Sequence, residues 1–97
     1  TVHSMIKTFR DKRTEELFDT GSAPGVPPDV QTRAVRKLDV IDSAVSIEHF
    51  CKPRGNRFHS LKGDRLGQYS IAVNDQWRIC FRFMGGHAYE VEFCDYH

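Results

Sequence analysis

Three short runs rich in β-branched and aromatic residues near the C-terminus constrain the fold of this chain more than any other feature. They cover residues 68–74, 77–83 and 88–94. The segments that join them are short and contain the Asn, Asp and Gly residues typical of hairpin turns. The sequence therefore predicts an antiparallel meander of three strands.

The side chains of these runs alternate between an apolar and a polar set, and successive side chains of a strand point to opposite faces. The face expected to pack on helices carries Tyr69, Ile71, Val73, Trp77, Ile79, Phe81, Phe83, Tyr89, Val91 and Phe93. The opposite face carries Ser70, Ala72, Arg78, Cys80, Arg82, Glu90, Glu92 and Cys94. No hydrophobic core would select that mixture of small and charged residues, so we expect this polar face to meet solvent or a ligand.

Two helices are expected before the meander. Asp11 can cap a helix over about residues 12–20, and Gly21 can end it. Pro28 suits the first turn of a second helix. One apolar stripe at helical spacing marks that second helix, formed by Val30, Ala34, Leu38, Ile41 and Val45.

The remaining segments complete an α+β order. Residues 6–9 form a short run typical of a strand, and residues 51–67 are rich in glycine and basic residues, which indicates an ordered loop. The order strand, helix, helix, three strands predicts two N-terminal helices packed on one face of a curved, mainly antiparallel sheet. We expect residues 5–97 to form one domain and residues 1–4 to be a cloning remnant or a frayed extension.

Net charge and cysteine content limit the ligands that the chain can bind and the compartment that it suits. The 97 residues carry a net charge of +1, too little to hold nucleic acid tightly by charge alone. Residues 50–82 nevertheless hold seven Lys and Arg against two Asp and Glu, which is compatible with a local phosphate site. Three cysteines without a CxxC pair favour free thiols in a reducing compartment. No run has membrane-span or signal-peptide character, so we expect a cytoplasmic protein that makes no membrane contact.

Several short motifs together resemble the HigB toxins of the RelE/ParE superfamily. They are Ile6-Lys7-Thr8-Phe9, His59-Ser60-Leu61-Lys62-Gly63-Asp64-Arg65, Tyr69-Ser70-Ile71, Asn74 through Ile79 and Asp95-Tyr96-His97. The resemblance implies a RelE/ParE-like fold and a ribosome-dependent endoribonuclease that cleaves mRNA without a cofactor. It also implies a HigA-like helix-turn-helix antitoxin, with operator DNA bound only through the toxin–antitoxin complex.

Metal-independent RNA cleavage needs a base for the 2′-hydroxyl, an acid for the leaving 5′-oxygen and a cation for the phosphate. His59 can transfer protons near neutral pH, and the guanidinium of Arg78 can grip two phosphate oxygens. On the residues alone, His59 is an exposed loop histidine and residues 95–97 are a surface tail. The resemblance instead implies a catalytic set of His59, Lys62, Arg78, Asp95, Tyr96 and His97.

Other basic residues are candidates for contact with RNA or the ribosome, with a solvated charge run as the alternative. They are Lys52, Arg54, Arg57, Arg65 and Arg82. Arg82 ranks lower because it can pair with Glu90 or Glu92 across the strands.

Two other functions remain open on the sequence, a ParE-like toxin that inhibits DNA gyrase without cutting RNA and a DNA-binding partner without toxicity. A zinc site built from Cys80, His87, Cys94 and His97 lacks the close paired spacing of structural sites, so we expect no metal.

Overall fold

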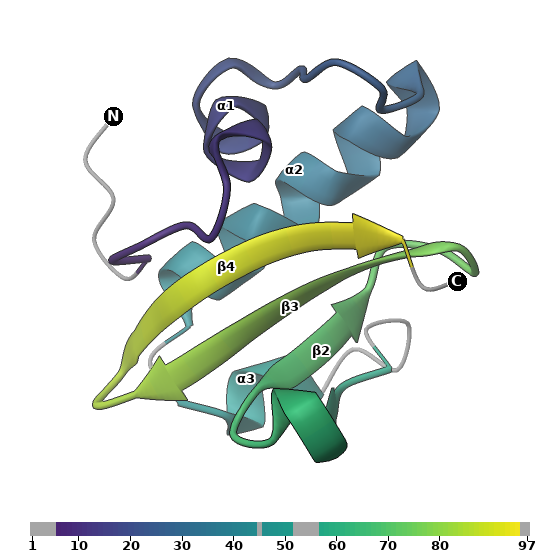
Figure 1. The fold of residues 1–97 in the computed structure, drawn as a ribbon. Coiled ribbons are helices and arrows are strands. Elements are labelled where there is room, and N and C mark those ends of the chain that lie inside the picture. Colours follow the sequence, from purple (N-terminus) through teal and green to yellow (C-terminus); the bar gives the residue numbers. More distant parts are fainter. Residues whose placement is uncertain (1–5, 45, 52–56, 96–97) are drawn as a thin grey trace.

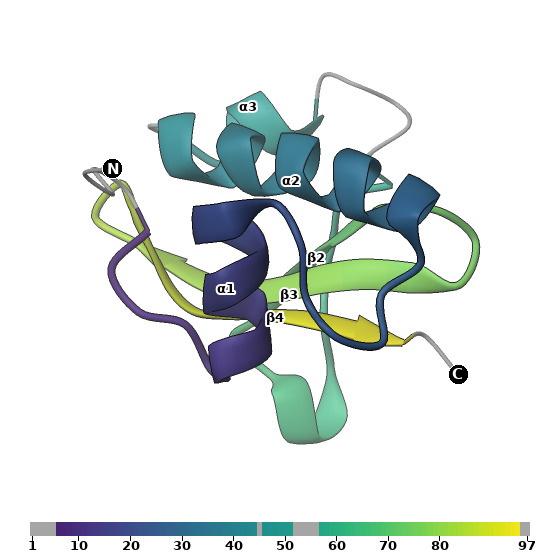
Figure 2. The same ribbon diagram turned by 90° about the horizontal axis from the view of Figure 1, so that it is seen from above.

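The computed structural model describes residues 6–44, 46–51 and 57–95, which form a layer of helices on a four-stranded sheet. The helices are α1 (Lys12–Thr20), α2 (Pro28–Ser43) and α3 (Glu48–Cys51). The strands are β1 (His59–Ser60), β2 (Tyr69–Ala72), β3 (Trp77–Met84) and β4 (His87–Asp95), antiparallel in the order β1-β2-β3-β4. The helices cover one face of the curved sheet, which confirms the predicted α+β architecture (Figure 1, Figure 2). We call the other side the outer face.

α1 begins and ends where the local sequence predicts. The Asp11 carboxylate accepts a hydrogen bond from the Thr14 backbone N–H at 2.8 Å, which satisfies an amide at the start of the helix. Gly21 takes a left-handed φ of +84°, and its N–H donates to the Leu17 carbonyl at 3.0 Å. Glycine adopts this conformation without steric cost, so the helix stops there.

α2 packs one apolar stripe into the core. Pro28 stands in its first turn, where the missing N–H leaves no helical hydrogen bond unmade. The predicted stripe residues Val30, Ala34, Leu38 and Ile41 are all buried. Val45, the last member of the predicted stripe, lies outside the described residues. None of the described helices has the length and apolar character needed to cross a membrane.

The predicted strand over residues 6–9 is not continuous in the structure. Ile6 and Phe9 form isolated parallel bridges with Ala88 and Val91 of β4. Hydrogen bonds of 2.8 Å from the Lys7 N–H to the Ala88 carbonyl and 2.9 Å from the Arg10 N–H to the Val91 carbonyl hold the segment beside β4. A regular ladder does not form because β4 is itself irregular at this point.

That irregularity is a β-bulge. The partner of Cys80 is Glu92, whereas the partner of Arg82 is Tyr89, so β4 has one more residue than β3 in this interval. Glu90 takes a left-handed φ of +53°, which is uncommon for residues other than glycine.

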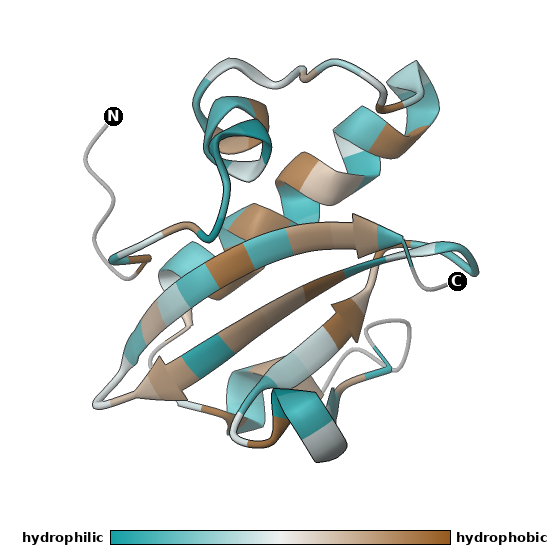
Figure 3. Ribbon diagram, viewed as in Figure 1, coloured by the Kyte–Doolittle hydropathy of each residue, from teal (hydrophilic) through white to brown (hydrophobic). Residues whose placement is uncertain are grey.

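The bulge reverses the alternation of side chains in the first part of β4. Ala88 is fully buried in the core, whereas Tyr89 lies opposite Arg82 of the outer face. The prediction that Tyr89 faces the core is therefore wrong, because strict alternation assumes no inserted residue. Beyond the bulge, Val91 and Phe93 are buried as predicted, and Figure 3 shows hydrophobic and hydrophilic residues alternating along this strand.

The basic segment before β2 is partly regular. β1 pairs His59 with Ser70 and Ser60 with Tyr69, and the 3₁₀ turn η2 (Gly63–Arg65) follows. Figure 2 shows η2 on the side of the sheet opposite the helices. This placement brings a short loop to the outer face.

Thr14 ties α1 to β4 through a buried hydrogen bond. Its hydroxyl accepts from the Phe93 backbone N–H at 2.9 Å. Thr14→Val keeps the shape of the side chain but leaves that N–H unsatisfied, so we expect the free energy of unfolding, measured with urea, to fall by about 1–3 kcal/mol. Thr32→Val, at an exposed position of α2, is the control and should cost less than about 0.5 kcal/mol. Equal losses in the two variants would contradict this role of Thr14.

Candidate functional site

Arg78 lies in the middle of the outer face. Its Cα partners are Ala72 of β2 and Cys94 of β4, so strands flank it on both sides. One guanidinium nitrogen, Nη1, donates to the hydroxyl of Ser70 at 3.1 Å. Because Ser70 is buried, this hydroxyl is a fixed point that orients the guanidinium.

His59 reaches Arg78 from the adjoining edge of the sheet. Its Nε2 lies 3.4 Å from Nη1 of Arg78, and its Nδ1 lies 3.1 Å from the Arg57 carbonyl oxygen. A guanidinium can only donate and a carbonyl can only accept. One neutral tautomer satisfies both contacts, with the proton on Nδ1 and the lone pair of Nε2 toward Arg78. That lone pair can accept a proton from a substrate once the N–H of Arg78 turns from it to a bound phosphate.

A hollow of about 240 Å³ opens beside Arg78 on the same face. Its lining consists of Leu61, Arg65, Arg78, Cys80, Cys94 and Asp95. Asp95, the last residue of β4, accepts a hydrogen bond from the side-chain amide of Gln76 at 3.1 Å. The fold thus brings two arginines and a carboxylate to one concave surface, with His59 in contact with one of the arginines.

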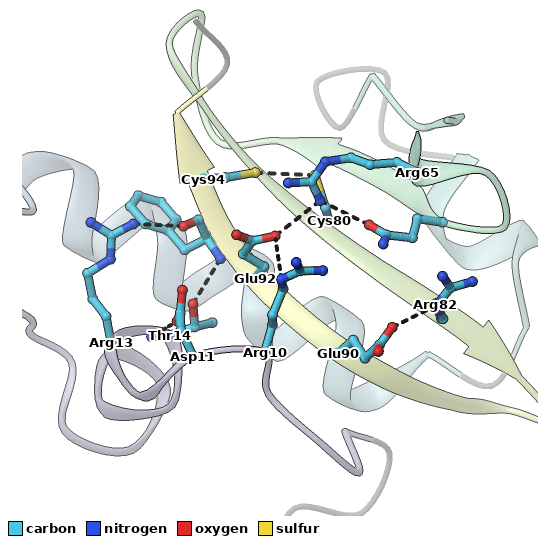
Figure 4. A network of polar contacts seen from close by, with 12 residues as sticks. Arg10, Asp11, Arg13, Thr14, Arg65, Cys80, Arg82, Glu90, Glu92 and Cys94 are labelled. Atoms are coloured by element: carbon cyan, nitrogen blue, oxygen red, sulfur yellow. Dashed lines mark hydrogen bonds and ion pairs between the residues drawn. The ribbon is translucent and has the colours of Figure 1, made fainter. Parts of the chain in front are cut away.

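Arg65 is anchored at this surface by Glu92 (Figure 4). Its Nη1 donates to Oε1 of Glu92 and to Oε1 of Gln68, both at 3.1 Å, and Nε of Arg10 lies 3.8 Å from the same Glu92 oxygen. Partial burial opposes the charged form of Arg65, but the hydrogen bond to Glu92 together with the charges of Glu92 and of the two cysteines outweighs it, so the pKa of Arg65 is raised. Glu92 therefore offsets the charge of two arginines.

The other predicted cations occupy different surroundings. Arg82 pairs with Glu90 at 2.7 Å, as its position across the strands predicted, and Arg57 pairs with Asp75 at 3.2 Å at an exposed site. Lys62 is exposed just before η2. Four predicted site residues lie outside the described residues, namely Lys52, Arg54, Tyr96 and His97.

Sequence reasoning missed two contacts in the hollow. One is the support of Arg78 by Ser70, and the other joins Cys80 and Cys94, whose Sγ atoms lie 3.2 Å apart. Alternation had placed all four residues on one face, but only the strand register shows which of them touch. Among the described residues, no group of three or more His, Cys, Asp and Glu side chains could hold a metal ion.

The two thiols of this pair are not equivalent. The hydrogen bond between the two thiols lowers the pKa of Cys80, and the guanidinium charges of Arg65 and Arg78 act in the same direction. The same hydrogen bond, together with burial, raises the pKa of Cys94. The surroundings therefore favour ionisation of Cys80 over that of Cys94.

Comparison with known proteins gives a consistent result. Residues 7–97 match the family described as RelE-like toxin of type II toxin-antitoxin system HigB. The chain is 41% identical over 93 residues to a Proteus vulgaris protein named endoribonuclease HigB, an alignment that covers 96% of this chain and all of that relative. It is also 33% identical over 85 residues to toxin HigB-1 of Vibrio cholerae serotype O1, covering 87% of this chain and 90% of that relative.

The arrangement around Glu92 predicts unequal roles for the two carboxylates on the outer face. Glu92→Gln removes the charge that faces Arg65 and Arg10 at a site where its side chain is 19% exposed, whereas the side chain of Glu90 is 47% exposed. We expect Glu92→Gln to lower the free energy of unfolding in urea by about 1–2 kcal/mol. The matched variant Glu90→Gln should cost less than about 0.5 kcal/mol, because exposed pairs are well screened. A larger loss for Glu90→Gln would refute this assignment.

Proposed function

The chain belongs to the HigB-like toxins of type II toxin–antitoxin systems, and we propose that it is a ribosome-dependent endoribonuclease that cleaves mRNA. The proposal extends to this chain the activity named for the Proteus vulgaris relative, which aligns with it over almost its whole length. Neither relative carries a name that points to DNA gyrase, so the names favour the nuclease over the ParE-like alternative.

The observation that carries the proposal is the contact of Arg78 with His59 at the border of the hollow. Arg78 is oriented by the buried hydroxyl of Ser70, and His59 presents the lone pair of Nε2 beside the same guanidinium nitrogen. A phosphate held by Arg78 would bring the adjacent ribose within reach of that nitrogen. A base and a phosphate-binding cation therefore adjoin one another.

In the proposed reaction, Nε2 of His59 takes the proton of the 2′-hydroxyl as that oxygen attacks phosphorus. The bond from phosphorus to the 5′-oxygen breaks, which leaves a cyclic phosphate and a free 5′-hydroxyl. Arg78 stabilises the negative charge that grows on the phosphate oxygens. The C-terminal residues supply the proton for the leaving oxygen, with Asp95 at the hollow and His97 carried over from the family resemblance.

The remaining candidates assist binding in this proposal. Lys62 and Arg65 hold the RNA backbone next to the hollow, and Tyr96 stacks on a base. Lys52, Arg54, Arg57 and Arg82 contact RNA or the ribosome.

Because a net charge of +1 binds free RNA only weakly, we propose that the ribosome positions the scissile phosphate. Because the target is the translating ribosome, the proposed site of action is the cytoplasm.

As a type II toxin, the protein has an antitoxin partner, which we propose is a HigA-like helix-turn-helix protein. Arg33, Arg36 and Lys37 line a groove on α2 and offer a positive surface for acidic residues of that partner. Burial and the neighbouring Arg33 lower the pKa of Lys37, so a carboxylate bound there would relieve the crowding of charge. Operator DNA is bound only through the toxin–antitoxin complex in this proposal.

The first test is Arg78→Ala, assayed by single-turnover mRNA cleavage on saturating ribosomes. Loss of the phosphate-stabilising guanidinium should lower the rate by about a hundredfold or more. Arg82→Ala removes an arginine from the same strand and face and is the control, with an expected loss below about threefold because saturating ribosomes compensate for a lost binding contact. Similar rates for the two variants would refute the role of Arg78.

The second test is His59→Gln in the same assay. Glutamine keeps a hydrogen-bonding side chain but cannot take up the proton of the 2′-hydroxyl, so we expect the rate to fall about 10²- to 10⁴-fold. His49→Gln, at an exposed position on α3, is the matched control and should leave the rate unchanged. Cleavage by His59→Gln at the rate of the His49 variant would exclude His59 as the base.

A further inference from the structure

We propose that Cys80 and Cys94 are an oxidation site, at which a peroxide converts the two thiols into a reversible disulfide that shuts down the outer-face site. The inactivation rests on the proposed nuclease function. The formation of the disulfide does not.

The two sulfur atoms already touch. Sγ of Cys80 and Sγ of Cys94 are 3.2 Å apart, and Figure 4 shows the two side chains pointing toward each other across β3 and β4. Because the direct partner of Cys80 is Glu92, Cys94 is its diagonal neighbour on the same face. A disulfide needs a sulfur separation of about 2.05 Å, so the two atoms must approach by roughly 1 Å.

The strand that carries Cys94 has room for this approach. Cys94 is next to the end of β4, and among the described residues that end of the strand pairs with β3 alone. A small shift of Cys94 toward β3 therefore breaks no second ladder, and the hydrogen bond of the neighbouring Phe93 N–H to Thr14 holds the rest of the strand in place.

A small oxidant can reach the pair through the hollow. Cys80 is only 2% exposed, but it and Cys94 both line the cavity of about 240 Å³. A peroxide molecule is little larger than water and fits within that volume. Cys51 sits on α3, on the helix side of the sheet, and is exposed, so it lies apart from this pair.

The charges around the two sulfur atoms indicate which of them reacts with the peroxide and which then completes the disulfide. Cys80 lies near the positive charges of Arg65 and Arg78, which favour its thiolate, and its contact with Cys94 lowers the pKa of Cys80 further. Thiolates, not thiols, attack peroxides. Cys80 is therefore the attacking sulfur and Cys94 the resolving one.

The chemistry balances with hydrogen peroxide as the oxidant. The Cys80 thiolate attacks one peroxide oxygen, the O–O bond breaks, and the departing hydroxide takes up a proton to become water. Cys80 is left as a sulfenic acid, having lost two electrons. The sulfur of Cys94 then attacks the sulfenic sulfur, the S–S bond forms, and the S–O bond breaks as the hydroxyl leaves with the Cys94 proton as a second water. Two thiols and one peroxide thus yield one disulfide and two waters.

Bond formation should disturb the site because both cysteines adjoin it. Cys94 is the Cα partner of Arg78 and directly precedes Asp95. Drawing Cys94 toward Cys80 shifts this carboxylate relative to the guanidinium. It also removes the ionisable thiol that faces the two arginines of the hollow. Misplacement of reacting groups by about 1 Å can cost a hundredfold in rate.

The experiment uses the full chain carrying Cys51→Ser, so that only the two site thiols remain. The protein is treated with hydrogen peroxide, quenched, and divided for intact mass, peptide mapping and single-turnover cleavage on ribosomes. We expect the mass to fall by two hydrogens, a linked peptide pair containing Cys80 and Cys94, and a loss of cleavage of about tenfold or more. Dithiothreitol should restore both the mass and the rate.

Two further variants provide matched controls in the same Cys51→Ser background, namely Cys80→Ala and Cys94→Ala. Each is compared with itself before and after peroxide. Cys80→Ala lacks the attacking sulfur, so its cleavage rate after peroxide should equal its rate before peroxide. Neither variant should give the linked peptides. If one variant does not fold, the other still tests the need for a pair.

The outcomes separate this inference from the proposed function. Thiols that remain unlinked after peroxide, or a linked protein that cleaves as fast as the reduced one, would overturn the oxidation switch. If the reduced protein itself does not cleave mRNA on ribosomes, the proposed function fails, while the mass and peptide map still decide whether the disulfide forms.

Discussion

The pairing of β3 with β4 is the constraint on which the whole outer face depends. Its register places Cys94 beside Arg78 and Glu92 beside Cys80, and so determines which polar side chains share the hollow. In β4 the bulge at Glu90 comes just before this stretch, so the reversed alternation of side chains is confined to the start of the strand. A one-residue slip without such a bulge would turn these side chains toward the core.

The outer face combines positive charge with paired carboxylates. Glu92 offsets Arg65 and Arg10, and Glu90 offsets Arg82, so these arginines are held in defined positions. Arg78 is oriented differently, by a neutral hydroxyl and a histidine. Arg78 also lines the hollow, where its guanidinium can bind two oxygens of a phosphate. The same concentration of positive charge favours a thiolate at Cys80, which links the oxidation chemistry to the nuclease site.

Much of the helical layer could be predicted because its signals are local. The cap at Asp11, the left-handed Gly21 and the stripe from Val30 to Ile41 each depend on residues within a few turns of one another. The candidate site was harder to predict. The sequence around His59 indicates only an ordinary loop histidine, and the family resemblance alone identified it as a site residue. Its contact with Arg78 joins residues 19 positions apart in the sequence and required the folded sheet.

The sequence by itself determined the two helices, the three-strand meander and the set of side chains available to the outer face, since these follow from hydrophobic periodicity and turn chemistry. Only the tertiary structure decided that Tyr89 lies opposite Arg82, that residues 6–9 make bridges in place of a strand, and that Cys80 meets Cys94. The physical reason is that the alternation of side chains along a strand predicts the face of the sheet on which each one lies, but not which side chain of the next strand it contacts. Partners depend on strand register and on one inserted residue at Glu90, whose N–H donates to the distant hydroxyl of Thr8 at 2.8 Å.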